Sequence, residues 1–256
     1  MRIALGLEYD GTHFHGWQRQ QNGRAVQAEV EAALSYVADA PVEVQCAGRT
    51  DAGVHADCQV VHFDAPVTRS PRAWVFGTNT RLPRTVAVRW AEPVDDQFDA
   101  RFSARARRYV YTLINRPSRP GRLRRFAAWE ARPLQVDAMQ QAAGHLLGEH
   151  DFTSFRTVAC QARSPVRTVH TLRLAREGDL VRMEIEANAF LHHMVRTIMG
   201  SLLVVGRGEQ PPEWIAEVLA ARDRCRAGVT AAAAGLLFVG PRYPREWGLP
   251  EEVCLP

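Results

Sequence analysis

A loop between two predicted strands reads Ala47-Gly48-Arg49-Thr50-Asp51-Ala52-Gly53-Val54-His55. Its two glycines permit tight turns and a close approach of the backbone to a ligand. Between them lie one carboxylate, one guanidinium and one hydroxyl. Asp51 either caps neighbouring amides in a turn or acts as a nucleophile or base, kept ionised by a nearby arginine. The spacing alone leaves both interpretations open.

The segments around this loop predict a first half that mixes strands with a helix. Residues 3–9 form an apolar strand candidate, and apolar side chains recur at helical spacing over 26–37. Short β-branched runs at 42–46, 59–63 and 86–90 predict three further strands. The first half therefore has the order strand, helix, strand, strand, followed by another short strand at 86–90.

The second half repeats that order. The pattern predicts a strand at 108–114, a helix at 136–147, strands at 166–174 and 180–187, a helix at 190–202 that Gly206 closes, and a last helix from Pro211. Two β-α-β-β blocks are typical of an α+β protein with mixed or antiparallel sheets flanked by helices. We expect an N-terminal half at 1–100, a C-terminal half at 101–245, a tail at 246–256, and an active-site cleft between the halves.

The composition excludes several classes of protein. All 32 basic residues are arginine, and the formal net charge is +4. Without lysine there is no Schiff-base chemistry and no Walker-type P-loop. Five scattered cysteines without a C-x-x-C pair favour neither a disulfide framework nor a zinc site. The longest apolar run, at 229–239, is too short for a membrane helix, which favours a cytoplasmic protein.

Residues 100–129 contain nine arginines and no acidic residue. Such a run is either a solvated basic face or a surface that contacts phosphates, and its length favours the second. The candidates for contact with an RNA backbone are Arg101, Arg105, Arg107 and Arg108. Tyr109 shares one strand face with Tyr111, so both rings are core residues, or else Tyr109 stacks on a base that has left its helix.

A third segment, Asn188 to Arg196, contains the adjacent pair His192 and His193. Neighbouring histidines on one helix point in different directions, which argues against a metal site, and no metal or cofactor is predicted. Arg196 is either a flanking surface arginine or the counter-ion of a catalytic aspartate.

With these segments identified, the chain resembles the tRNA pseudouridine synthase A (TruA) family. The resemblance covers nearly the whole chain in order. It is carried by E-Y-D-G at 8–11, G-W-Q-R-Q at 16–20, G-R-T-D-A-G-V-H at 48–55, R-F-S-A at 101–104, R-Y at 108–109, D-F-T-S-F at 151–155 and F-L-H-H-M-V-R at 190–196.

The resemblance implies the pseudouridine synthase fold and conversion of uridine to pseudouridine at positions 38, 39 and 40 of the tRNA anticodon stem-loop. It implies that Asp51 is the catalytic aspartate and that Arg196 pairs with it. Tyr109 would pack against the target base, and Arg49 would help to displace the target nucleotide. It also implies a homodimer that binds tRNA without a cofactor or metal.

Two alternatives make different predictions. A non-catalytic protein that binds structured RNA would hold tRNA whatever residue stands at position 51, and would leave the RNA unchanged. A nucleosidase or glycosidase would release free base and would need a second carboxylate near Asp51. Only Asp57 and Asp64 are close in sequence, and neither lies in the resembling segment.

Overall fold

The computed structural model describes residues 1–255 and divides into two compact units. The first unit comprises residues 1–107 together with 238–255, and the second comprises Arg108–Leu237. Two strands cross the division, one near residue 107 and one near residue 238. No helix among residues 1–255 is long and apolar enough to cross a membrane.

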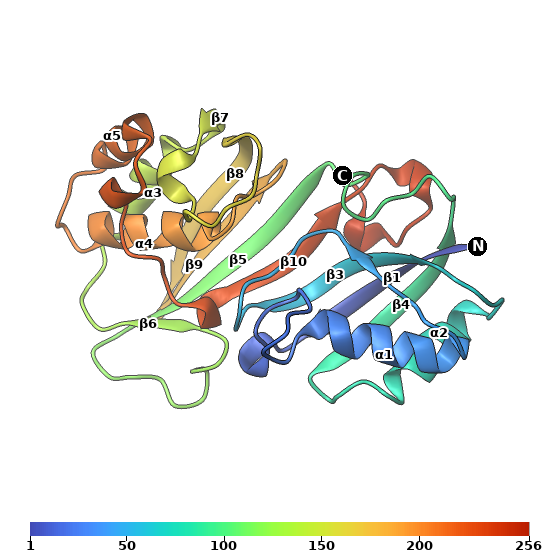
Figure 1. Ribbon diagram of the computed structural model, residues 1–256. Coiled ribbons are helices and arrows are strands. Elements are labelled where there is room, and N and C mark those ends of the chain that lie inside the picture. The colour runs from blue at the N-terminus through green and yellow to red at the C-terminus, as the bar shows by residue number, and fades with distance from the viewer. Residues whose placement is uncertain (256) are drawn as a thin grey trace. The chain divides into compact units, whose positions relative to one another are not determined.

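The first unit is a sheet covered by two helices. The strand order is β4-β1-β3-β10, and β2 pairs with Val61 and His62 of β3. The bounds are β1 Arg2–Tyr9, α1 Val26–Ala38, β2 Gln45–Cys46, β3 His55–Asp64, α2 Pro71–Asn79, β4 Val86–Val94 and β10 Leu236–Arg242. β1 lies antiparallel to both β3 and β4. Figure 1 shows α1 and α2 side by side against this sheet, where α2 contacts β4.

The C-terminal segment belongs to the core of the first unit. Tyr243 and Val253 are fully buried, and the Tyr243 hydroxyl donates to the carbonyl oxygen of Ala100 at 2.5 Å. Leu249 and Val253 pack in one cluster with Ala4 and Val60 of the central strands. The bounds therefore differ from those expected from sequence: residues 101–107 and the segment expected as a tail from 246 both lie with the N-terminal half. The strand β10, which was not predicted from the sequence, returns the chain to the first unit.

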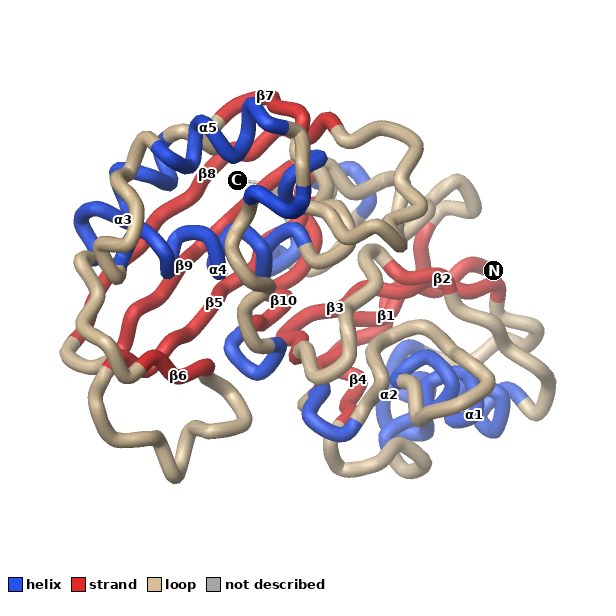
Figure 2. The backbone as a smooth tube through the Cα atoms, turned by 60° about the vertical axis from the view of Figure 1, so that its left-hand side comes forward, coloured by secondary structure: helices blue, strands red, loops and turns tan. Residues whose placement is uncertain are grey.

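The second unit likewise combines strands with helices packed against them. Its strand order is β5-β9-β8-β7, and the short β6 runs parallel to β5. The bounds are β5 Ala106–Asn115, β6 Ala128–Glu130, α3 Val136–Gly144, β7 Gly148–Asp151, β8 Val166–Glu177, β9 Leu180–Ala187, α4 Met194–Gly206 and α5 Trp214–Ala221. Figure 2 shows α3, α4 and α5 along this sheet, where α3 packs on β8 and on both other helices.

Most predicted elements are present, and the α+β class with mixed sheets is confirmed. Three differences have physical causes. α2 was missed because its nine residues are only weakly apolar overall, although Ser70 caps it and Pro71 opens it. α4 begins at Met194 rather than Phe190, because His193 takes a left-handed backbone with φ 64°. The β6 and β7 strands were missed because they have only three and four residues, and β10 was also missed.

Candidate active site

The Ala47–His55 loop connects β2 to β3 in the first unit, and the segment after β1 packs directly against it. The backbone N–H of Trp17 donates to the carbonyl oxygen of Thr50 at 3.0 Å. Gly16 adopts φ 98°, and a Cβ there would lie 2.7 Å from the same oxygen. Only glycine satisfies both the left-handed backbone and this close approach. The residue before Asp51 is thereby fixed to a different part of the chain.

A second glycine lets the same segment reach the other end of the loop. A Cβ on Gly11 would lie 1.9 Å from the carbonyl oxygen of Val54, and the Gly11 N–H donates to Nδ1 of buried His55 at 3.1 Å. Asp10 Oδ1 stands 3.2 Å from the same Nδ1 and caps the following turn through the Thr12 N–H. The Gly-x-x-x-x-Gly spacing of Gly11 and Gly16 thus places backbone on both sides of Asp51.

Asp51 itself opens a tight turn. The Val54 N–H donates to the Asp51 carbonyl oxygen at 3.1 Å, and Gly53 occupies the third turn position with φ 77°. That backbone is the one a type II turn requires. The Gly53 N–H donates in addition to the Phe14 carbonyl oxygen at 3.2 Å. The main chain of Asp51 is therefore constrained, while its side chain stays partly exposed.

Beneath the loop lies a buried polar cluster formed by Tyr9, Gln59 and Thr50. Gln59 is completely buried in β3, and its Nε2 donates to the Gly48 carbonyl oxygen at 2.5 Å while its Oε1 accepts from the Gly48 N–H at 3.4 Å. The Tyr9 hydroxyl lies 2.8 Å from Thr50 Oγ1 and 3.5 Å from Gln59 Nε2. Burial raises the pKa of Tyr9 well above its usual range, so the hydroxyl remains protonated.

The predicted arginines of the first unit fall into two groups. Arg49, Arg101 and Arg105 are exposed. Arg107 differs, because its guanidinium donates to the carbonyl oxygens of Ala47 at 3.1 Å, of Ala104 at 3.1 Å and of Arg101. Arg107 was predicted to contact an RNA backbone, but in the structure it holds the residue that precedes Gly48.

The second unit contains the predicted aromatic residue. Tyr109 on β5 is buried and meets the ring of Phe190 edge-on, with the ring centroids 5.1 Å apart. Tyr111, two residues further on, is fully buried and its hydroxyl donates to the Ala232 carbonyl oxygen at 2.8 Å. Burial raises the pKa of Tyr111 above its usual range, and Arg196 partly opposes that shift. Arg108, on the other face of β5, lies 4.0 Å from the carboxylate of Glu186.

Arg196 lies in the first turns of α4 and is oriented by a strap at 228–232. Its Nε donates to the Ala231 carbonyl oxygen at 2.8 Å, and the Ala231 N–H donates back to the Arg196 carbonyl oxygen at 3.0 Å. Two glycines allow the strap to touch the helix: a Cβ on Gly200 would lie 1.7 Å from the Val229 carbonyl oxygen, and one on Gly228 would lie 2.7 Å from the Gly200 carbonyl oxygen. With Nε engaged, the direction of the guanidinium is set by the strap.

The two histidines precede α4 instead of lying on it. Their ring centroids are 4.2 Å apart with the planes tilted by 52°. The argument that adjacent histidines diverge on a helix is therefore wrong for this pair, because the left-handed backbone of His193 brings the rings together. The His192 carbonyl oxygen accepts from the Thr157 N–H at 3.2 Å, which anchors the segment.

Comparison with known proteins gives one consistent result. The model of a family described as tRNA pseudouridine synthase matches residues 7–103 and 142–244. A tRNA pseudouridine synthase A from Xanthomonas euvesicatoria pv. vesicatoria (strain 85-10) is 58% identical over 99% of both chains. Another from Stenotrophomonas maltophilia (strain K279a) is 57% identical over 100% of both chains. The chain belongs to the tRNA pseudouridine synthase family.

Among solved structures, a Cbf5-Nop10-Gar1 complex matches 78% of this chain and 45% of that chain at 12% identity and a TM-score of 0.38. A likeness at that level carries no argument about this synthase. The family-model match and the full-length relatives identify the protein as an isomerase that acts on tRNA.

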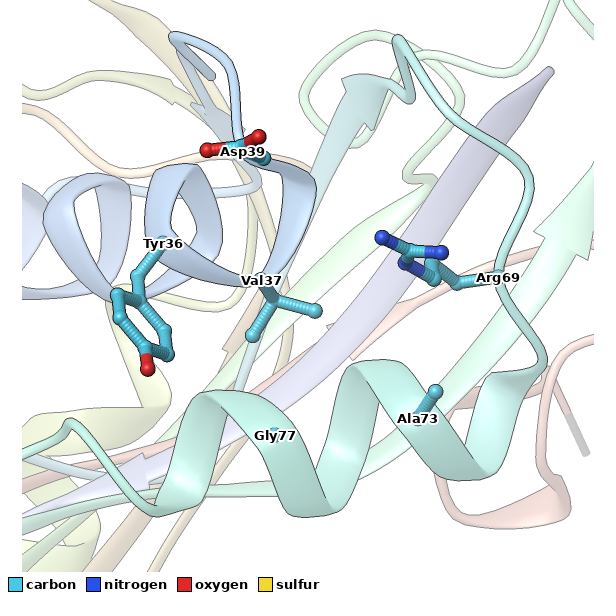
Figure 3. A pocket seen from close by; sticks show the side chains of 6 residues that line it. All are labelled: Tyr36, Val37, Asp39, Arg69, Ala73 and Gly77. Carbon is cyan, nitrogen blue, oxygen red and sulfur yellow. The ribbon is translucent and has the colours of Figure 1, made fainter.

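The first unit also has a surface hollow. It lies between α1 and α2, has a volume of about 590 Å³, and is open to solvent. Figure 3 shows its lining, namely Tyr36, Val37, Asp39, Arg69, Ala73 and Gly77. Its one carboxylate, Asp39, follows the last turn of α1 with φ 51°. None of the predicted site residues lines it.

The structure groups the predicted residues by unit. Arg49, Asp51, Arg101, Arg105 and Arg107 lie in the first, and Arg108, Tyr109 and Arg196 lie in the second. The pairing of Asp51 with Arg196 stays a prediction. Sequence reasoning missed Gln59, although a glutamine in the otherwise apolar run Val60, Val61 and Phe63 was a visible signal.

Proposed function

We propose that this synthase converts uridine to pseudouridine at positions 38, 39 and 40 in the anticodon stem-loop of tRNA, with Asp51 as the nucleophile or base. The proposal rests on two properties of the Asp51 loop, namely its constrained backbone and its partly exposed carboxylate. Its backbone is bonded to the segment 11–17 on both sides of the aspartate, while the Asp51 side chain remains partly exposed. A constrained carboxylate that substrate can reach is what covalent or base catalysis requires.

The reaction breaks the N1–C1′ glycosidic bond, turns the uracil over and joins C5 to C1′. C5 then loses its proton and N1 gains one, so atoms and electrons balance without a co-reactant. Three first steps are open to an ionised Asp51: attack on C1′, addition to C6 of the ring, or abstraction of the 2′ proton to give a glycal. Each places the carboxylate within bonding or proton-transfer reach of the nucleoside.

Arg196 supplies the positive charge in this proposal. Desolvation by bound RNA favours the neutral form of Asp51, and a guanidinium beside it opposes that effect. A planar guanidinium also binds a carboxylate through two parallel N–H···O bonds, which fixes the direction of the carboxylate. The bond from Arg196 Nε to the Ala231 carbonyl oxygen supports this role, because it fixes the direction of the guanidinium.

Tyr109 provides a flat face for the displaced uracil. Base–aromatic stacking contributes about 1–3 kcal/mol, enough to restrain a detached base while it rotates. The edge-on contact with Phe190 supports the role, because it holds the Tyr109 ring in one plane. Arg49 helps to displace the target nucleotide, and exposed Arg101 and Arg105, with Arg108, contact phosphates of the RNA.

We further propose that the synthase is a cytoplasmic homodimer that uses no cofactor or metal. The support is its full-length likeness to the tRNA pseudouridine synthase A relatives and the atom balance of the isomerisation. Sedimentation of the purified protein with and without tRNA tests the dimer.

The decisive experiment compares wild type, Asp51→Asn and Asp57→Asn on unmodified tRNA. Asn is isosteric with Asp but cannot act as a nucleophile or base, and Asp57 is an acidic residue six positions further along the same segment. Pseudouridine is mapped across the anticodon arm, and tRNA affinity is measured in parallel. We expect wild type and Asp57→Asn to modify positions 38–40, and Asp51→Asn to bind tRNA without modifying it. Binding by all three proteins without any modification would favour the non-catalytic RNA-binding alternative.

A further inference from the structure

The structure assigns a positioning role to the buried carboxamide of Gln59, which holds the backbone on which Asp51 is carried. The inference rests on the proposed role of Asp51. Gln59 is completely buried on β3, and it satisfies both backbone groups of Gly48, three residues before Asp51. The carboxamide offers both a donor and an acceptor at this reach without carrying a charge.

The contacts of Gln59 continue towards the aspartate. One Nε2 hydrogen goes to the Gly48 carbonyl oxygen, and the other faces the Tyr9 hydroxyl oxygen at 3.5 Å. That oxygen also lies 2.8 Å from Thr50 Oγ1, and either hydroxyl can donate in this hydrogen bond. Thr50 adjoins Asp51 and is itself held by the Trp17 N–H. The path Gln59–Tyr9–Thr50 therefore ends one residue from the carboxylate.

The position of this cluster under the loop argues against a purely stabilising role. The residues on either side of Gln59 in β3, Cys58 and Val60, are buried and apolar, and a leucine or methionine at position 59 would pack without needing partners. A buried amide is costly unless every polar atom is bonded, so its presence is informative. What the amide adds over an apolar side chain is direction, because its two bonds hold the peptide groups on both sides of the Gly48 Cα. A catalytic carboxylate depends on such an orientation, because a misplacement of about 1 Å costs about 100-fold in rate.

The first test replaces Gln59 by methionine, which keeps the length and removes both bonds. The matched control is Asn79→Leu, because the Asn79 side chain bonds both backbone groups of Val88 in the same unit, at 2.8 and 2.9 Å, away from the Asp51 loop. Single-turnover kcat, tRNA affinity and thermal stability are measured for both. We expect both variants to lose stability, but only Gln59→Met to lose kcat, by about 10- to 100-fold at unchanged tRNA affinity.

The second test uses Gln59→Glu and the pH. A neutral glutamic acid can donate to the Gly48 carbonyl oxygen and accept from its N–H as glutamine does, whereas the ionised form can only accept. Burial favours the neutral form. We therefore expect kcat of the Glu variant, relative to wild type and per folded molecule, to rise as the pH falls. A role confined to stability would leave that ratio flat.

The outcomes separate the two proposals. If Asp51→Asn is as active as wild type, the assignment of Asp51 fails, and the role of Gln59 fails with it. If Asp51→Asn is inactive while Gln59→Met retains full kcat below its melting temperature, only the positioning role is overturned. Equal losses of kcat in Gln59→Met and Asn79→Leu would also overturn it, because the effect would then be general to the unit.

Discussion

Arg107 donates two hydrogen bonds to the carbonyl oxygen of Ala47, from Nε at 3.4 Å and from Nη2 at 3.1 Å. A side chain from the arginine-rich segment is thus bound to the first residue of the Asp51 loop. The guanidinium makes further bonds to Ala104 and Arg101. An arginine that serves the protein's own backbone has little capacity left for phosphate, in contrast to exposed Arg105 two residues earlier.

This contrast predicts opposite effects of two neighbouring substitutions. Arg107→Gln should destabilise the fold by about 1–3 kcal/mol, because buried carbonyl oxygens lose their donors, and should leave the salt dependence of tRNA binding unchanged. Arg105→Gln should leave stability unchanged and reduce the slope of log affinity against log salt by about one. Denaturant unfolding and binding over a salt series measure both. A reduced slope for Arg107→Gln alone would return that residue to the RNA surface.

The close approach of Gly11 to Val54 predicts an unequal tolerance of alanine among the glycines. Gly11→Ala puts a methyl group 1.9 Å from the Val54 carbonyl oxygen, so we expect a loss of about 1–3 kcal/mol from forced backbone movement. Gly48 is the matched control inside the Asp51 loop, because its Cβ would meet only the Phe238 ring at 3.8 Å. Gly48→Ala should change stability by less than about 0.5 kcal/mol. Thermal unfolding distinguishes the two, and equal losses would contradict the packing described here.

His62 predicts a pH dependence of stability. Burial lowers the pKa of this imidazole from its usual 6.5, against a smaller opposite effect of Asp99. Its Nδ1 accepts from the Ala100 N–H at 3.0 Å, a bond that the protonated ring cannot make. Because the unfolded state binds the proton more tightly, the contribution of His62 is complete above pH 6.5 and is lost as the pH falls through the lowered pKa.

The measurement is the free energy of unfolding between about pH 8 and about pH 5 for wild type and His62→Asn. Asparagine keeps an acceptor near the position of Nδ1 but does not titrate. We expect wild type to lose more stability on acidification than the variant. Parallel curves would show that another group carries the acid sensitivity.

Arg196 predicts a separation of chemistry from binding. Arg196→Lys keeps the charge but loses both the planar fork and the geometry of the bond to Ala231. We expect kcat to fall by about 10- to 100-fold with tRNA affinity within a few-fold of wild type. Single-turnover rates and a binding titration test this. A loss of affinity without a loss of kcat would make Arg196 a contact for the RNA instead of a partner for Asp51.

The sequence by itself determined the α+β class, the order of most strands and helices, and the candidates Asp51, Tyr109 and Arg196. Local patterns suffice for these, because apolar periodicity reflects which face of an element is buried. The Asp51 loop was visible because its glycines and polar residues are adjacent in the chain.

Only the tertiary structure decided which residues support that loop. Gly11, Gly16, Gln59 and Arg107 come from three segments, and each acts through a backbone contact that no local pattern encodes. The same holds for the C-terminal segment, which carries no distinctive motif and yet places Tyr243 and Val253 in the core of the first unit. Buried side chains are selected by neighbours that are distant in sequence, so their partners become evident only when the chain is folded.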